Sequence, residues 1–358
     1  MSGLEQEFFI NTNTDESTQP LENSIPPTVR PSAVVCFDTE ARQRILKAFD
    51  KDSERDMQDN INDVMHSAQV AENNYLKNAR LLMKNGEYSL ALNLIREALS
   101  INSKSGDAIK LLGECFLGQG KTQEAIQCFK SLVKIDVSFD SLNMLAKAYY
   151  SNGDDNSALD FYMKALEMQV FDDVVLFEIY KNIGNIYVRA GDLDTARENY
   201  NKAYTINPDS EVLLVNFGTL EIQQSHWGEA VDFFRRAVKI NPSFDKAWMG
   251  LALVHREYGD HELAWANIEK CLDYNPQNDI ALKMAVGWAF RDGKTQKIIS
   301  RLEDYLEKNG SDISVSILLA QILYDVGQVK HARLEIERVL SFEPTNVAAL
   351  DLMKLMER

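Results

Sequence analysis

The chain has 358 residues, of which 45% are hydrophobic and 26% charged, and its formal net charge is −16. This composition can supply a hydrophobic core, whereas the acidic balance disfavours nucleic acid or anionic membranes as partners, because phosphate binding needs clustered Lys and Arg. No apolar run reaches the roughly 18 residues of a membrane-spanning helix, and residues 1–20 lack the pattern of a secretion signal, so we expect a cytoplasmic protein without membrane insertion.

The first seventy residues differ from the rest of the chain. Residues 1–34 are rich in Thr, Asn, Glu, Ser and Pro, which predicts a disordered N-terminal arm. Residues 35–71 predict an amphipathic capping helix region, with an alternative use of residues 32–49 as a short docking segment. The apolar residues that approximate a helical stripe in this region are Ile45, Phe49, Met57, Ile61, Val64, Met65 and Ala68.

A regular period begins near Glu72 and continues to residue 344. Successive turn positions are 34, 33, 38, 34, 34, 34 and 34 residues apart, which indicates eight units with a four-residue insertion near residues 168–174. Ser225 stands where the other units have glycine. The turn positions are Gly86, Gly120, Gly153, Gly191, Ser225, Gly259, Gly293 and Gly327.

Each unit reads as two helices joined by a turn. In residues 180–208, Tyr180, Ile183 and Tyr187 recur at helical spacing before Gly191, and a second helical stripe follows it. Pro208 then ends the second helix, because proline has no amide donor and clashes with the preceding turn.

Small residues recur at one position of each helix, where a larger side chain would force the two helices apart. The seventh unit departs from this pattern, with Val286 and Ile298 at these positions. On the first helices the residues are Ala79, Gly113, Ala146, Gly184, Gly218, Ala252 and Ala320. On the second helices they are Ala91, Ala125, Ala158, Ala196, Ala230, Ala264 and Ala332.

This pattern of large, small, aromatic and proline positions over 34 residues resembles the tetratricopeptide repeat family. The resemblance covers about four fifths of the chain and is strongest between Phe177 and Gln277. It implies an all-α, right-handed α-solenoid in which the first helices line the concave side, because stacked neighbours supply the core that one unit lacks. Residues 345–358 then predict a C-terminal capping helix.

Signatures of catalysis or metal binding are missing from the sequence. It contains no HExxH, no phosphate-binding lysine loop and no GxSxG. The five histidines do not pair with Cys or acidic residues at ligand spacing, and the four cysteines form no CxxC pair. We therefore expect no enzyme activity, no metal and no cofactor, and reduced cysteines that are buried or, alternatively, form a redox switch.

Polar residues on the expected concave face form one candidate binding site. Asn182 and Asn185 have a structural alternative, because Asn is common at these positions of the repeat. The resemblance implies a clamp for a C-terminal carboxylate, as in co-chaperones of this family, although Gly250 replaces one expected cation and Arg256 is the substitute that we consider. The polar candidates are Lys181, Asn182, Asn185, Asn216, Lys246 and Arg256.

Apolar candidates continue the same face toward the C-terminus. They suit an amphipathic helix or an irregular peptide, because Met adapts its shape to a partner, and the alternative is packing beneath the terminal helix. These candidates are Met249, Leu253, Met284 and Phe290.

The functional hypothesis is a non-catalytic scaffold or adaptor that binds a partner peptide or helix in the concave groove. Two alternatives remain from the sequence. The first is a co-chaperone-like receptor for a C-terminal carboxylate, and the second is a regulatory subunit of a signalling or enzyme complex.

Overall fold

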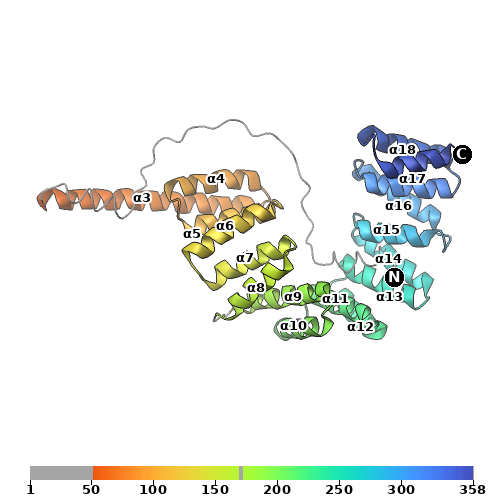
Figure 1. Cartoon of the computed structure of the whole chain (residues 1–358), viewed down its shortest axis with the longest axis horizontal. Coiled ribbons are helices and arrows are strands. Elements are labelled where there is room, and N and C mark those ends of the chain that lie inside the picture. Colours follow the sequence, from red (N-terminus) through yellow and green to blue (C-terminus); the bar gives the residue numbers. More distant parts are fainter. Residues whose placement is uncertain (1–50, 169–171, 358) are drawn as a thin grey trace. The chain divides into compact units, whose positions relative to one another are not determined.

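The computed structural model describes the backbone of residues 51–168 and 172–357, and side chains from residue 65 onward. The predicted N-terminal arm and residues 35–50 of the predicted capping region lie outside the described residues. Within the described ranges every regular element is an α-helix (Figure 1).

The chain divides at residue 172 into two compact units, here called the N-terminal and C-terminal units. The predicted insertion near residues 168–174 falls at this division. The N-terminal unit contains α3 (Lys51–Lys84), α4 (Tyr88–Ile101), α5 (Gly106–Gly118), α6 (Thr122–Ile135), α7 (Phe139–Ser151) and α8 (Asp155–Leu166). The C-terminal unit contains α9 (Asp173–Ala190), α10 (Leu193–Ile206), α11 (Glu211–Gln223), α12 (Trp227–Ile240), α13 (Asp245–Glu257), α14 (His261–Tyr274), α15 (Asp279–Ala289), α16 (Thr295–Lys308), α17 (Ile313–Asp325), α18 (Val329–Phe342) and α19 (Val347–Met356).

Within each unit, consecutive helices pack in pairs, from α3 with α4 to α17 with α18. The small residues predicted at the helix crossings are all buried, which confirms their packing role. An aromatic ring explains several of them: a Cβ on Gly113 or Gly218 would lie within 3.0 Å of the ring of Phe129 or Phe234. These separations are shorter than a carbon contact of about 3.5–4.0 Å, so only glycine fits.

The turn within each pair uses a left-handed backbone conformation. Its glycines have φ between 66° and 80°, and Ser225 has φ 61° at the equivalent position. This confirms the predicted equivalence of Ser225, which is the one non-glycine residue with positive φ in the described ranges. A side chain in this conformation costs roughly 1–2 kcal/mol, so Ser225 carries a local strain that the glycines avoid.

Aspartate follows the turn glycine in three pairs and begins the second helix. Asp154, Asp192 and Asp260 accept hydrogen bonds of 3.1 Å from the backbone N–H groups of Ser157, Thr195 and Leu263. Such N-caps satisfy donors that the helix leaves unpaired and complement its dipole.

A side-chain hydrogen bond ties the end of several repeats to their own beginning. The side-chain amides of Asn102 and Asn241 donate to Glu72 and Glu211 over 3.4 and 3.2 Å. Asn275 donates to Asp245 over 2.7 Å. In each case the asparagine ends the second helix, and the acid lies 30 residues earlier in the first turns of the repeat.

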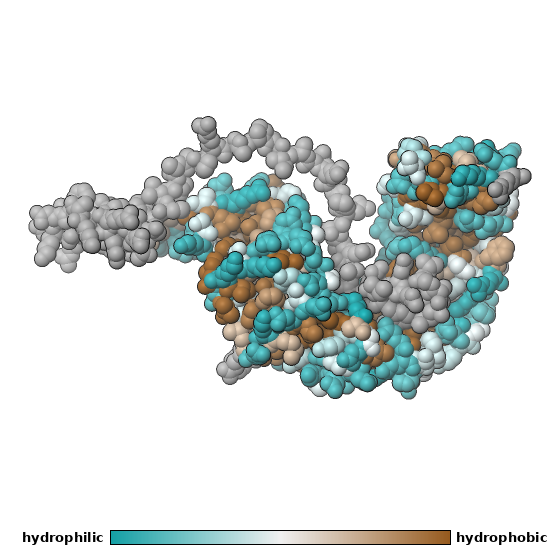
Figure 2. Space-filling view, in the orientation of Figure 1, coloured by the Kyte–Doolittle hydropathy of each residue, from teal (hydrophilic) through white to brown (hydrophobic). Residues whose placement is uncertain are grey.

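The seventh pair, α15 with α16, packs less extensively than the others, and Val286 stands at its small-residue position. Ile298, which stands at the small-residue position of α16, is nevertheless fully buried, so the pair retains a core. After α18, α19 covers the last pair with Ala349 and Leu352. Hydrophobic side chains also gather on the surface at this end of the C-terminal unit (Figure 2), where Phe342 and Val347 are exposed.

Candidate protein-interaction surface

Three first helices, α9, α11 and α13, carry the polar candidates. Asn185 on α9 and Asn216 on α11 are both 2% exposed, and the Asn216 amide donates to Asn185 Oδ1 over 2.8 Å. The Tyr200 hydroxyl of α10 donates to the same oxygen over 2.7 Å. We call Asn185, Asn216, Tyr200 and the nearby Thr219 the amide cluster.

The amide cluster contains two acceptors that lack hydrogen-bond donors. Asn216 Oδ1 and Thr219 Oγ1 are buried and have no hydrogen-bond partner. The two residues are three positions apart on α11 and therefore neighbours on its surface. A buried polar atom without a partner costs about 1–3 kcal/mol, so two of them on one helix face need an explanation. Thr219 was missing from the sequence candidates.

The predicted lysines lie on the same helices in different surroundings. Lys181 is half-buried, forms a 2.7 Å ion pair with Glu178 and lies over the ring of Phe177 at 5.7 Å. Lys246 is half-buried at the start of α13, and Asn182 is buried on α9. The structure therefore joins Asn185 to Asn216 directly and places Lys181 one turn before Asn185 on α9.

Packing explains why a glycine occupies the missing clamp position. The Cβ of any residue at position 250 would lie 2.6 Å from Phe234 Cδ1 and closer still to two other ring atoms. A Cβ added to Gly218 would likewise lie 2.7 Å from Cε1 and Cζ of the same ring. The ring thus fills a slot between two glycines, and a clamp cation at position 250 would displace it.

Arg256, the residue considered as a substitute for the missing clamp cation, already forms an ion pair with another residue. It forms an ion pair with Asp292 in which each side chain is 10% exposed, and its guanidinium lies over the Trp288 ring at 5.0 Å. Trp265 donates to the same carboxylate over 2.6 Å. Burial alone would raise the pKa of Asp292, but the hydrogen bonds from Arg256 and Trp265 outweigh it and lower the pKa. Arg256 would have to leave this pair to bind another carboxylate.

The apolar candidates divide into two groups. Met249, Leu253 and Met284 are 2–5% exposed and belong to the largest core cluster of the C-terminal unit. Phe290 at the end of α15 is 67% exposed. In this structure only Phe290 presents its side chain for direct contact, and any contribution of the other three depends on their packing beneath the surface.

A buried acid that sequence reasoning missed stabilises the connection after α11. Glu221 is 2% exposed and accepts hydrogen bonds of 3.0 Å from Arg197 Nη2 and 3.0 Å from His226 Nδ1. Burial would raise the pKa of Glu221, but these partners more than offset it and lower the pKa. The available signal was an acid inside the apolar run of α11, which requires a partner when buried.

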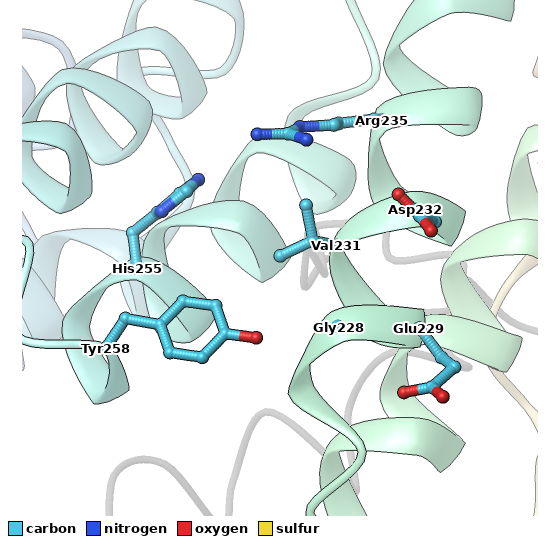
Figure 3. A pocket seen from close by; sticks show the side chains of 7 residues that line it. All are labelled: Gly228, Glu229, Val231, Asp232, Arg235, His255 and Tyr258. Carbon is cyan, nitrogen blue, oxygen red and sulfur yellow. The ribbon is translucent and has the colours of Figure 1, made fainter.

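A cavity of about 510 Å³ lies between α12 and α13 (Figure 3). The side chains of His255 and Arg235 point toward each other, and the Tyr258 hydroxyl points toward Gly228. Burial and the nearby Arg235 lower the pKa of His255. Because Glu229 and Asp232 also line this cavity, its charges favour no single class of ligand.

The cysteines of the described chain are poor nucleophiles. Burial raises the pKa of Cys115 and of Cys128 to about 11. Cys271 is fully buried, and burial raises its pKa as well. Such thiols react slowly because the thiolate is the reactive form. Within the described residues, no three metal-binding side chains gather as a candidate metal site.

The paired helices, crossing residues and turns define a helical repeat protein. Profiles described as Tetratricopeptide repeat match residues 82–142, 139–170, 175–243 and 215–277, which together span more than half of the chain. The chain belongs to the tetratricopeptide repeat family, and it is an all-α helical repeat solenoid.

Curated relatives share parts of this repeat region. Anaphase-promoting complex subunit 3 of Schizosaccharomyces pombe is 26% identical over 180 residues, which cover 49% of this chain and 26% of that protein. The BBSome complex member BBS4 of Mus musculus is 24% identical over 321 residues, covering 78% of this chain and 60% of that protein. Human Protein O-mannosyl-transferase TMTC1 is 26% identical over 163 residues, 45% of this chain and 18% of that protein. The chain spans less than two thirds of the length of each of these relatives.

Among solved structures, pilF of Pseudomonas aeruginosa has a TM-score of 0.52 at 14% identity and covers 62% of this chain and 99% of that chain. This similarity supports the fold. Within the described residues, no helix combines the length and the apolar character needed to cross a membrane.

Proposed function

We propose that the chain is a non-catalytic adaptor that binds another protein through α9, α11 and α13. Family membership supports this role, as do two relatives whose names place them in multisubunit complexes, the anaphase-promoting complex and the BBSome. The match to TMTC1, a transferase by name, covers only 18% of that protein, so the repeats alone supply no basis for transferring its activity. A cytoplasmic location belongs to the same proposal.

The two unpartnered acceptors of the amide cluster carry the proposal. Asn216 Oδ1 and Thr219 Oγ1 need donors, and both lie on α11 between the helices that supply Lys181 and Lys246. An extended peptide presents a row of backbone N–H groups. Because both oxygens are buried, these donors reach them once the side chains of Asn216 and Thr219 turn outward. The ligand class that fits best is therefore an extended peptide that donates backbone hydrogen bonds to α11.

Thr219→Val separates a binding role from a structural one, because it keeps the side-chain shape and removes the hydroxyl. Without its unpaired hydroxyl, the isolated protein should gain about 1 kcal/mol of stability. Binding should weaken by about 3–10-fold, because the partner loses a hydrogen bond of about 1 kcal/mol. Thr205→Val is the control, since Thr205 is exposed on α10 and its hydroxyl donates to the Lys202 carbonyl over 2.7 Å.

The experiment begins with affinity capture from native lysate and continues with calorimetry on the purified partner. Lys181→Ala combined with Lys246→Ala tests the flanking cations, with Lys270→Ala on the exposed face of α14 as the control. Unchanged affinity in Thr219→Val and in the double variant would reject this surface. Failure to recover any stoichiometric partner would reject the adaptor role itself.

The carboxylate-receptor alternative predicts a distinct result. Affinity would then depend on a ligand's free C-terminus and fall strongly when that terminus is amidated. The adaptor proposal expects amidation to leave affinity unchanged, because the hydrogen bonds to Asn216 and Thr219 come from the peptide backbone. The closed position at Gly250 and the engaged Arg256 favour the adaptor over the receptor.

A further inference from the structure

The first helix of the N-terminal unit is much longer than its partner. α3 has 34 residues and α4 has 14, so at 1.5 Å per residue they extend about 51 Å and about 21 Å. Asn102 at the end of α4 donates to Glu72, which places that end level with the middle of α3. Residues 51–71 therefore extend beyond α4 (Figure 1).

This extension carries a heptad pattern. From Met57 to Tyr75 the apolar residues are spaced 4, 3, 4, 3 and 4 positions apart, which is the spacing of a coiled-coil seam. The stripe enters the repeat core at Tyr75 and Leu76, where α4 covers it. The seam residues are Met57, Ile61, Val64, Ala68, Ala71 and Tyr75.

α4 covers the stripe at Tyr75 and Leu76 but ends level with Glu72, so this helix does not continue along the part of the stripe before Glu72. Ala68 and Ala71 are half-buried, and their neighbours Met65 and Val70 are both 45% exposed. Among the described helices, α3 packs against α4 and α5, both of which belong to the repeat region. An apolar seam that continues past the end of its partner helix is suited to packing against another helix.

Helix propensity alone does not explain the extension. Eight of the 21 residues from 51 to 71 are Asp, Asn or Ser, which favour caps and turns over helix interiors. Most helical stability in proteins comes from packing of an apolar face. Residues 51–71 should therefore be stable as a helix only when their seam is covered.

We propose that a second copy of this chain covers the seam and that the extensions of two chains form a coiled-coil dimer. Between Met57 and Ala71, the positions that flank the seam are Gln58, Asn60, Met65 and Ser67, so two identical helices meet there without opposing like charges. Charged residues such as Asp56 and Asp63 fall on the outer positions of the heptad.

The short connection to α3 disfavours cover of the seam by the residues that directly precede it. The apolar residues Ile45 and Phe49 come closest in sequence, but only Asp50 separates Phe49 from the start of α3. A hairpin of two antiparallel helices needs a loop of about 2–5 residues. A second copy offers the complementary seam without this restriction.

Sedimentation and light scattering of the full chain test the proposal over a range of concentrations. The wild-type protein should show twice the monomer mass. Val64→Asp should raise the dimer dissociation constant by at least about 100-fold, because the symmetric seam would bury two unpaired carboxylates. Asn62→Asp adds the same charge at an outer position and should leave the mass unchanged, and Val64→Leu should retain the dimer.

A cross-linking experiment keeps the test decisive if Val64→Asp also unwinds the helix. In a parallel pair each seam residue faces its own copy, so Val64 lies next to Val64 of the second chain. In a Cys36→Ser background, Val64→Cys should give a disulfide-linked dimer under mild oxidation, whereas Asn62→Cys and the unsubstituted background should not. A monomer at every concentration, or a dimer unaffected by Val64→Asp and not trapped through Val64→Cys, would overturn the proposal.

Discussion

Replacing glycine by alanine should have opposite effects on stability at two positions of the C-terminal unit. Gly250 packs against the buried Phe234 ring, whereas Gly287 has open space around it. Gly250→Ala places a Cβ 2.6 Å from Phe234 Cδ1, which is shorter by nearly an ångström than an ordinary carbon contact of about 3.5–4.0 Å. The ring is completely buried and its position also depends on Gly218, so it has little space to retreat. Gly287→Ala places a Cβ that meets no atom within 4 Å.

The expected magnitudes follow from two terms. Overpacking costs about 1–3 kcal/mol, and replacing a helical glycine by alanine gains about 1 kcal/mol. Because the ring is confined, Gly250→Ala should destabilise the protein by about 1–2 kcal/mol. Gly287→Ala should stabilise it by about 1 kcal/mol, since only the propensity gain applies.

Urea unfolding followed by circular dichroism measures both variants against the wild-type chain. Adding Phe234→Leu to Gly250→Ala supplies the missing space, so the pair should show a favourable coupling of about 1 kcal/mol in a double-mutant cycle. The steric reasoning is refuted if Gly250→Ala proves as stable as Gly287→Ala, or if the cycle shows no coupling.

Three further predictions concern the turns, the caps and the buried ion pair. Ser225→Gly should stabilise the protein by about 1 kcal/mol by relieving the left-handed conformation, as measured by the urea midpoint; a lower midpoint would contradict it. Lys121→Asp should increase the free energy of unfolding by about 1 kcal/mol. Lys121 is the N-cap of α6 and has backbone angles close to those of the aspartate caps, but its side chain makes no cap hydrogen bond. Calorimetric melting checks this prediction, with Lys121→Ala as the comparison. Asp292 has a lowered pKa, so its contribution is present above the unfolded pKa near 3.9 and is lost as pH falls through the folded value. Asp292→Asn should therefore cost about 3 kcal/mol at pH 7, because Arg256 remains buried without its counter-ion, and less at pH 3; an equal loss at both values would contradict the ion-pair account.

The repeat architecture could be predicted because its signals are local and recur. Glycine at the turn and a small residue at each helix crossing meet the same steric demand in every unit. Even Ser225 could be placed, since the period puts it at the turn position that the other units fill with glycine. The weak seventh unit followed from Val286, whose larger side chain accompanies looser packing of α15 on α16.

The candidate site was less predictable because its contacts join residues that no period relates. Arg256 meets Asp292 36 residues later, and the choice of Asp292 over other acids depends on the turn after α15. Position 250 requires glycine because it packs against Phe234, which belongs to the preceding repeat. The missing donors of Asn216 and Thr219 became visible only once the partners of each atom were known.

The asparagine that closes three of the repeats on their own first acid makes each of these blocks a self-contained module. Removing residues 211–244 would join Ser210 to Asp245 and would keep the bond between Asn275 and Asp245 within one block. Ser210, which caps α11 through a 3.3 Å bond from the Leu213 backbone, would then precede α13 in place of Phe244, which makes no such bond. Gene duplication or protein engineering can therefore shorten or lengthen this array in whole blocks, without inventing a new junction each time.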